Sequence, residues 1–117
     1  MVHKKAFAKA SEKYNQIHQF LDEKEDTYLL MEAFRMSGYC YEQRRNYSDA
    51  VKCYQRALDI GGQLDEDLRR KSTLPYIGKQ IIRLNIKRLA VHKSDAVERQ
   101  LEKLVGKDWK TLNPATA

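Results

Sequence analysis

One helical pattern occurs three times in this sequence, and its recurrence most constrains the fold. In "YSDAVKCYQRALDI", four apolar or small residues have the spacing that places side chains on one face of an α-helix, namely Ala50, Tyr54, Ala57 and Leu58. The tetrapeptide Ser-Asp-Ala-Val at Ser48 returns at Ser94, 46 residues later. A third copy begins at Phe7, 40 residues before Tyr47. Such periods are typical of stacked helical hairpins.

The composition agrees with an all-α domain. Only 5 glycines and 2 prolines interrupt the 117 residues, and residues with high helix propensity are abundant. A chain of this length forms one domain and buries about 65% of the surface that it exposes when unfolded. We therefore expect a single helical domain over residues 1–112.

Residues that typically begin and end helices flank two of the copies. Ser48 and Asp49 can accept hydrogen bonds from the free amides of a first turn, and residues 61–62, both glycine, can end that helix. In the last copy we expect Ser94 to cap the helix and Gly106 to end it.

The partner helices should lie between the copies. In the later one, Pro75 suits a first turn, and the apolar stripe consists of Ile77, Ile81, Leu84 and Leu89. We predict a helix over residues 7–21, hairpins over 27–61 and 73–105, Trp109 packed over the last helix pair, and a frayed tail at 113–117. Residues 62–73 are compatible with a loop, a short helix, or the first turns of a helix bent at Pro75.

The first complete hairpin resembles the tetratricopeptide repeat. The residues that carry the resemblance are Phe34, Gly38, Tyr41, Ala50, Tyr54 and Ala57. The match is good over residues 31–62. It implies hairpins of an A and a B helix, closely packed at the small residues and stacked as a short right-handed superhelix whose A helices line a concave face.

The sequence departs from that pattern in several places. Ser37 replaces the usual leucine, and Gly62 replaces the closing proline. In the last repeat Ala96 follows Gly78 by 18 residues, whereas the corresponding interval in the first hairpin is 12, so we expect a longer A helix. The first copy has only its B helix, which suggests a fragment of a longer repeat protein or an edge buried in a homo-oligomer. The alternative fold is a three-helix bundle of the microtubule-interacting and trafficking type, which "NYSDAVKCYQRAL" also resembles.

No motif for catalysis, cofactors or metals is present, so we expect a chain that is not an enzyme and has no small-molecule substrate. His3, His18 and His92 are far apart in the sequence, and the acidic stretch 22–26 lies at a helix junction, where solvated charge is usual. The two cysteines, Cys40 and Cys53, lie among apolar neighbours, which favours a reducing, cytoplasmic setting. No apolar run reaches the ~20 residues of a transmembrane helix.

The resemblance implies a scaffold that binds a partner peptide or helix on its concave face. The exposed A-helix positions selected by it are Arg35, Tyr39, Glu42, Lys79 and Arg83. Cations on this face could pair with carboxylates of an acidic partner, although a solvated face would show the same pattern. Chaperone-tail binding is disfavoured, because Tyr39 stands where that class has asparagine.

The net charge gives an alternative function. With 22 Lys and Arg against 16 Asp and Glu, the formal charge is +6, which would attract nucleic acid or an acidic membrane surface. Nucleic acid is the less favoured of these partners, because the aromatic residues fall on core stripes rather than between the cations.

Overall fold

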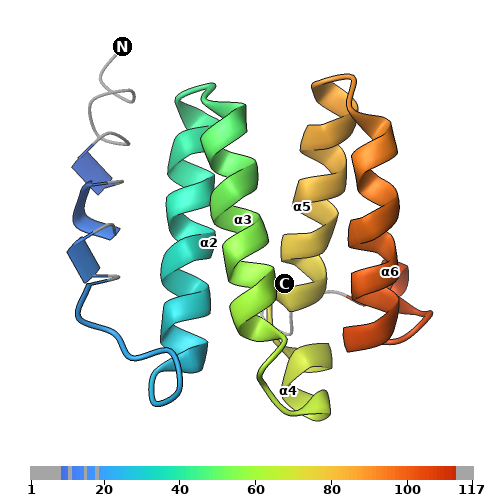
Figure 1. Ribbon diagram of the computed structural model, residues 1–117, viewed down its shortest axis with the longest axis horizontal. Helices are drawn as coiled ribbons and strands as arrows, with labels where there is room; N and C mark the ends of the chain where they lie inside the picture. Colours follow the sequence, from blue (N-terminus) through green and yellow to red (C-terminus); the bar gives the residue numbers. More distant parts are fainter. Residues whose placement is uncertain (1–8, 11, 15, 18, 113–117) are drawn as a thin grey trace.

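The computed structural model describes residues 9–10, 12–14, 16–17 and 19–112, and in this part of the chain all regular structure is helical (Figure 1). The predicted all-α class is therefore confirmed. The elements are α2 (Thr27–Gln43), α3 (Tyr47–Gly61), α4 (Glu66–Lys71), α5 (Leu74–Lys87), α6 (Ser94–Leu104) and the short 3₁₀ segments η1 (Val91–Lys93) and η2 (Trp109–Thr111).

The chain forms two antiparallel hairpins that pack side by side. Helices α2 and α3 form the first hairpin, α5 and α6 form the second, and α5 packs against α3 (Figure 1). Because α6 packs on α5, the structure has one long helix more than a three-helix bundle of α2, α3 and α5 would have.

The predicted helix over residues 7–21 is only partly described. Residues 9–10, 12–14 and 16–17 are helical, and residues 19–20 form a turn. Tyr14 and Ile17 line a shallow apolar groove together with Leu29 of α2, so this segment lies beside the first hairpin. The other residues predicted for this helix, and the tail at 113–117, lie outside the described residues.

A glycine in each hairpin lets its two helices approach closely. A Cβ atom at Gly38 of α2 would lie 3.0 Å from the ring of Tyr54 in α3. The equivalent atom at Gly78 of α5 would lie 2.7 Å from Cγ of Leu101 in α6. The predicted role of small residues between paired helices therefore holds in both hairpins.

The core runs through both hairpins. Tyr54, Ala57 and Leu58 of α3 are buried, and the stripe of α5 adds the fully buried Ile77, Ile81 and Leu84. Leu89, which we predicted for the same stripe, is 89% exposed. The prediction was wrong because α5 ends at Lys87, so Leu89 no longer follows the helical period.

The caps differ from those predicted. Asn46, not Ser48, caps α3, and its side chain accepts a hydrogen bond from the Asp49 amide at 3.3 Å. Ser94 is the first residue of α6 rather than its cap, because the chain enters this helix directly from η1. The predicted ends at residues 61–62 and near Gly106 are confirmed.

Helices α2 and α5 are each followed by a residue other than glycine in the left-handed backbone conformation. After α2, Arg45 has a φ of 61°, and the amide of Asn46 donates to the carbonyl of Tyr41 at 2.9 Å. After α5, Leu89 has a φ of 58°, and the amide of Ala90 donates to the carbonyl of Asn85 at 2.7 Å. Glycine is the usual residue in this left-handed helix end, so both positions hold an unfavourable backbone conformation.

The second A helix is not longer, as the sequence predicted, but shorter. Helix α5 has 14 residues and α2 has 17. Past its glycine, however, α5 continues for nine residues, from Gly78 to Lys87, whereas α2 continues for five, from Gly38 to Gln43. The connection 88–93 is also longer than the connection 44–46. The wider spacing therefore reflects both a later helix end relative to the glycine and a longer turn between α5 and α6.

The segment between the hairpins forms the short helix α4, which settles the open prediction for residues 62–73. Two of its arginines satisfy carbonyl groups at the end of α6. Arg69 donates from Nε to the carbonyl of Leu104 at 2.6 Å, and Arg70 donates from Nη1 to that of Val105 at 2.7 Å. Nη1 and Nη2 of Arg70 also donate to the carboxylate of Asp108, at 2.8 and 2.7 Å.

The segment after α6 returns to the core. Trp109 is 5% exposed and belongs to the buried cluster, and η2 contacts α5. The prediction that Trp109 packs back onto the last helix pair is confirmed for α5.

Candidate partner-binding surfaces

The five residues predicted to bind a partner define a surface that we call the α2–α5 face: Arg35, Tyr39, Glu42, Lys79 and Arg83. The structure brings two of them together across the hairpins, since Arg83 forms an ion pair with Glu42. The same carboxylate accepts a hydrogen bond from the hydroxyl of Tyr54 at 3.2 Å. This cluster connects α2, α3 and α5.

Two further predicted residues also have partners within the chain. Arg35 donates to Glu32 at 2.6 Å, and the second oxygen of Glu32 accepts from the Thr73 hydroxyl at 2.7 Å. Lys79 donates to the carbonyl of Leu112 at 2.7 Å. Tyr39 is 39% exposed. Much of the α2–α5 face therefore stabilises the packing of the hairpins and of the C-terminal segment.

The hydroxyl of Tyr54 remains a hydrogen-bond donor at any ordinary pH. Burial raises the pKa of Tyr54 strongly, and the negative charge of Glu42 raises it further. The ring itself is 1% exposed. The contact with Glu42 is thus a fixed feature of the core edge.

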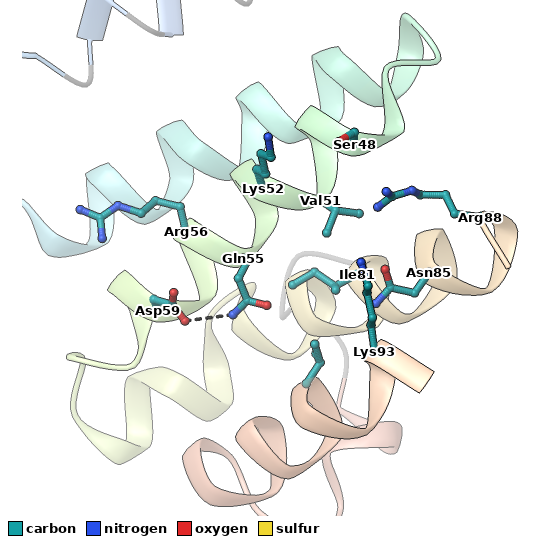
Figure 2. A pocket seen from close by; sticks show the side chains of 11 residues that line it. Ser48, Val51, Lys52, Gln55, Arg56, Asp59, Ile81, Asn85, Arg88 and Lys93 are labelled. Atoms are coloured by element: carbon teal, nitrogen blue, oxygen red, sulfur yellow. Dashed lines mark hydrogen bonds between the residues drawn. The ribbon is translucent and has the colours of Figure 1, made fainter. Parts of the chain in front are cut away.

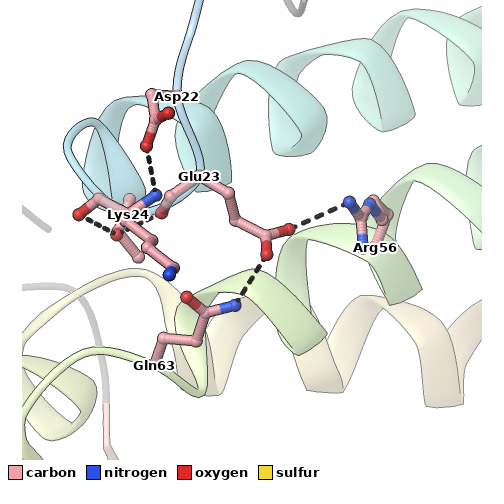
Figure 3. A network of polar contacts seen from close by, with 6 residues as sticks. Asp22, Glu23, Lys24, Arg56 and Gln63 are labelled. Carbon is pink, nitrogen blue, oxygen red and sulfur yellow. Dashed lines mark hydrogen bonds and ion pairs between the residues drawn. The ribbon is translucent and has the colours of Figure 1, made fainter.

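The acidic stretch 22–26 forms a structured turn (Figure 3). The Asp22 carboxylate accepts hydrogen bonds from the amides of Glu25 at 3.0 Å and Lys24 at 2.8 Å, and these bonds lower its pKa. The Glu23 carboxylate accepts hydrogen bonds from Arg56 of α3 at 2.9 Å and from Gln63, just after α3, at 3.1 Å. The stretch therefore attaches the start of the first hairpin to α3 and to the residues that follow it.

A second surface was not predicted from the sequence. A hollow of about 470 Å³ lies between α3, α5 and the start of α6, and we call it the basic groove (Figure 2). Its lining residues are Ser48, Val51, Lys52, Gln55, Arg56, Asp59, Ile81, Asn85, Arg88, Lys93 and Val97. A volume of this size is typical of binding pockets.

The charges that line the basic groove are mostly positive. Figure 2 shows the side chain of Arg88 extended toward Val51 and that of Lys93 extended toward Asn85, both from the segment that joins α5 to α6. The structure gives neither of them an ion pair among the described residues. The single lining carboxylate, Asp59, is already hydrogen-bonded at 2.9 Å to each of Gln55 and Gln100. Arg88 and Lys93, both exposed, therefore give this end of the groove a positive charge that no ion pair in the described chain offsets.

Two buried polar atoms at this end have no hydrogen-bond partner. Asn85, which lines the groove, is 2% exposed, and its Oδ1 atom has no donor within the described part of the protein. The Oγ atom of Ser94, next in sequence to the lining residue Lys93, is in the same situation. An unpaired buried polar atom costs about 1–3 kcal/mol, so such atoms are rare in folded proteins.

Sequence reasoning missed the basic groove because its residues come from separate elements. Val51 and Ile81 look like ordinary core positions, and Arg88 and Lys93 look like solvated charges beside a helix end. Only the packing of α5 and α6 against α3 brings these side chains around one hollow. A polar Asn85 within the apolar stripe of α5 was the one visible signal.

The cysteines are poorly suited to nucleophilic chemistry. Cys40 is buried and Cys53 is half-buried. Burial raises the pKa of the Cys53 thiol to about 11, with a further contribution from Asp49. At neutral pH this thiol is protonated.

The raised pKa gives a testable prediction. At pH 8 we expect iodoacetamide to modify Cys53 in the native chain roughly a hundredfold more slowly than in the urea-unfolded chain. Folding raises the pKa of the thiol from 9.0 to about 11, and the fraction present as the reactive thiolate falls roughly a hundredfold. Mass spectrometry of timed samples measures this. Equal rates in the two states would contradict the buried environment of the thiol.

The described residues contain no group of three or more His, Cys, Asp or Glu side chains that could hold a metal ion. Within the same residues, no helix has the length and apolar character needed to cross a bilayer. Comparison of the chain with models of protein families, with curated proteins and with solved structures gives no significant match. The tetratricopeptide resemblance therefore stays a prediction from the residues.

Proposed function

We propose that this chain is a non-catalytic scaffold of tetratricopeptide-like hairpins that binds an acidic peptide segment of a partner protein in the basic groove. One observation carries the proposal. Arg88 and Lys93 line a hollow whose one carboxylate, Asp59, is already hydrogen-bonded to two glutamine amides, and neither cation has an ion pair within the described chain. A binding partner that brings carboxylates would offset this charge.

An acidic peptide has the matching groups. Its Asp and Glu side chains can pair with Arg88 and Lys93. Its aliphatic side chains can contact the apolar wall of the groove, formed by Val51, Ile81 and Val97. None of the lining residues is aromatic, which disfavours a nucleic acid strand held by base stacking.

The proposed site differs from the α2–α5 face that the sequence predicted. A partner carboxylate on that face would compete with Glu42 for Arg83, and it would meet Lys79 already bound to Leu112. The internal contacts favour a structural role for these side chains. The α2–α5 face remains a predicted second surface, and the basic groove is the one we propose to test.

The test is selection from a random peptide library displayed on phage, followed by titration of a selected peptide in solution. We expect the selected sequences to combine Asp or Glu with aliphatic residues. The double variant Arg88→Glu, Lys93→Glu should bind the peptide at least about tenfold more weakly, because two charge-assisted contacts become repulsive.

A matched control separates a specific site from general attraction. Lys103→Glu with Lys107→Glu changes the net charge by the same amount at exposed positions that do not line the groove. This variant should keep nearly full affinity at physiological salt. If both double variants weaken binding equally, or if the library yields no acidic sequences, the proposed function is wrong.

A further inference from the structure

One end of the molecule collects positive charge from both hairpins. The turns α2–α3 and α5–α6 lie at the same end (Figure 1). We call this the basic end, and its cations are Arg44, Arg45, Lys87, Arg88 and Lys93. Residues 43–48 and 86–94 include no aspartate or glutamate, and the nearest carboxylates, Glu42, Asp49 and Asp95, lie just outside them. The cations outnumber these carboxylates, so the local charge is positive and comes from two separate segments.

Apolar side chains project from the same end. Leu89 is 89% exposed, more than any other large apolar residue in the described part of the chain, and Val91 is 56% exposed. Ile86, in the last turn of α5, is 54% exposed. Helix connections are usually polar, so a protruding aliphatic tip between Arg88 and Lys93 needs an explanation.

Folding does not explain the leucine. Leu89 makes no contribution to the core, and its φ of 58° is a conformation that disfavours side chains and suits glycine. At the equivalent end of α2 the position is occupied by the charged Arg45. An exposed, strained residue that stabilises neither backbone nor core points to a binding role.

We infer that the basic end docks on a membrane surface that carries anionic phospholipids. Leu89 and Val91 enter the headgroup layer, and the surrounding cations contact lipid phosphates. Charge and apolar insertion reinforce each other in this geometry, because Leu89 and Val91 lie between Arg88 and Lys93 in the sequence and the turn with Arg44 and Arg45 lies at the same end of the molecule. A tip that projects into solvent fits a fluid interface better than a protein pocket, whereas the basic groove nearby is concave. This inference does not depend on the peptide partner proposed above.

The experiment is co-sedimentation with vesicles of phosphatidylcholine alone and of phosphatidylcholine with phosphatidylserine, at physiological salt. We expect binding only to the anionic vesicles. Leu89→Gly should reduce the partition coefficient by about tenfold, since a leucine side chain is lost from the interface. The same variant should have an unchanged or higher thermal midpoint, because glycine suits the backbone conformation.

Two controls make the result specific. Leu68→Ser removes a leucine that is 41% exposed on α4, at the opposite end of the molecule, and should not alter partitioning. Arg44→Glu with Arg45→Glu should weaken binding more than Lys103→Glu with Lys107→Glu, although the change in net charge is equal.

Several outcomes would overturn the inference. These are no binding to anionic vesicles, binding that Leu89→Gly leaves unchanged, or equal loss from the two charge-reversed pairs. Peptide affinity measured without vesicles should be unaffected by Leu89→Gly, because Leu89 does not line the basic groove. Failure of membrane docking and failure of peptide binding can therefore be told apart.

Discussion

Replacing Gly78 with valine is expected to lower the free energy of unfolding by about 3 kcal/mol. The first added carbon would already lie 2.7 Å from Cγ of Leu101, whose side chain is fully buried and has no space to move into. Valine adds two methyl groups beyond that carbon and has a restricted rotamer in a helix. Helices α5 and α6 would have to separate. Urea denaturation followed by circular dichroism measures the effect.

A double variant tests the cause. Leu101→Ala alone should destabilise the fold by about 2–5 kcal/mol, because it leaves a cavity. Combined with Gly78→Val, the loss should be smaller than the sum of the two, since the valine fills part of that cavity. Gly62→Ala is the control, because its Cβ would lie no closer than 3.3 Å to its neighbours. Additive losses would show that Gly78 and Leu101 do not share one contact.

Tyr54→Ala is expected to lower the free energy of unfolding by about 4 kcal/mol. The ring is 1% exposed and packs on Gly38, so its removal leaves a cavity between α2 and α3. Tyr54→Phe keeps the ring and loses only the hydrogen bond to Glu42, and should cost about 1 kcal/mol. The midpoints of urea denaturation of the two variants measure the difference.

The matched control is Tyr28→Ala, in the first turn of α2. Tyr28 is 42% exposed, and its loss should change the free energy of unfolding by less than about 1 kcal/mol. Similar losses for the alanine and phenylalanine variants of Tyr54 would mean that the hydroxyl, not the ring, dominates. That result would contradict the packing role assigned to this residue.

The helices and their pairing could be predicted because they depend on local spacing. Gly38 and Tyr54 fall on facing stripes whose period can be read directly, and the same holds for Gly78. The class of the fold and the close approach of paired helices follow from such stripes. The stacked arrangement of a tetratricopeptide superhelix is a further step that the stripes alone do not determine.

Other features depend on contacts that spacing does not reveal. Ser94 is a good capping residue by type, but η1 runs directly into α6 and leaves no cap position for it. Leu89 was assigned to the apolar stripe of α5, but it lies five residues after Leu84, and the left-handed turn that ends α5 takes it out of the helix. From the sequence we predicted that Arg83 binds a partner, and only the packing of the two hairpins reveals its ion pair with Glu42.

The arginine contacts from α4 to the end of α6 have a consequence for how the molecule unfolds. Arg69 and Arg70 belong to the linker between the hairpins, yet they bind carbonyl groups 35 residues further along the chain. Melting of the second hairpin would strip the linker of these acceptors, and loosening of the linker would expose the carbonyls of Leu104 and Val105. Stacked repeats can in principle come apart one at a time. Here the hydrogen bonds of Arg69 and Arg70 make the linker and the second hairpin a single cooperative unit.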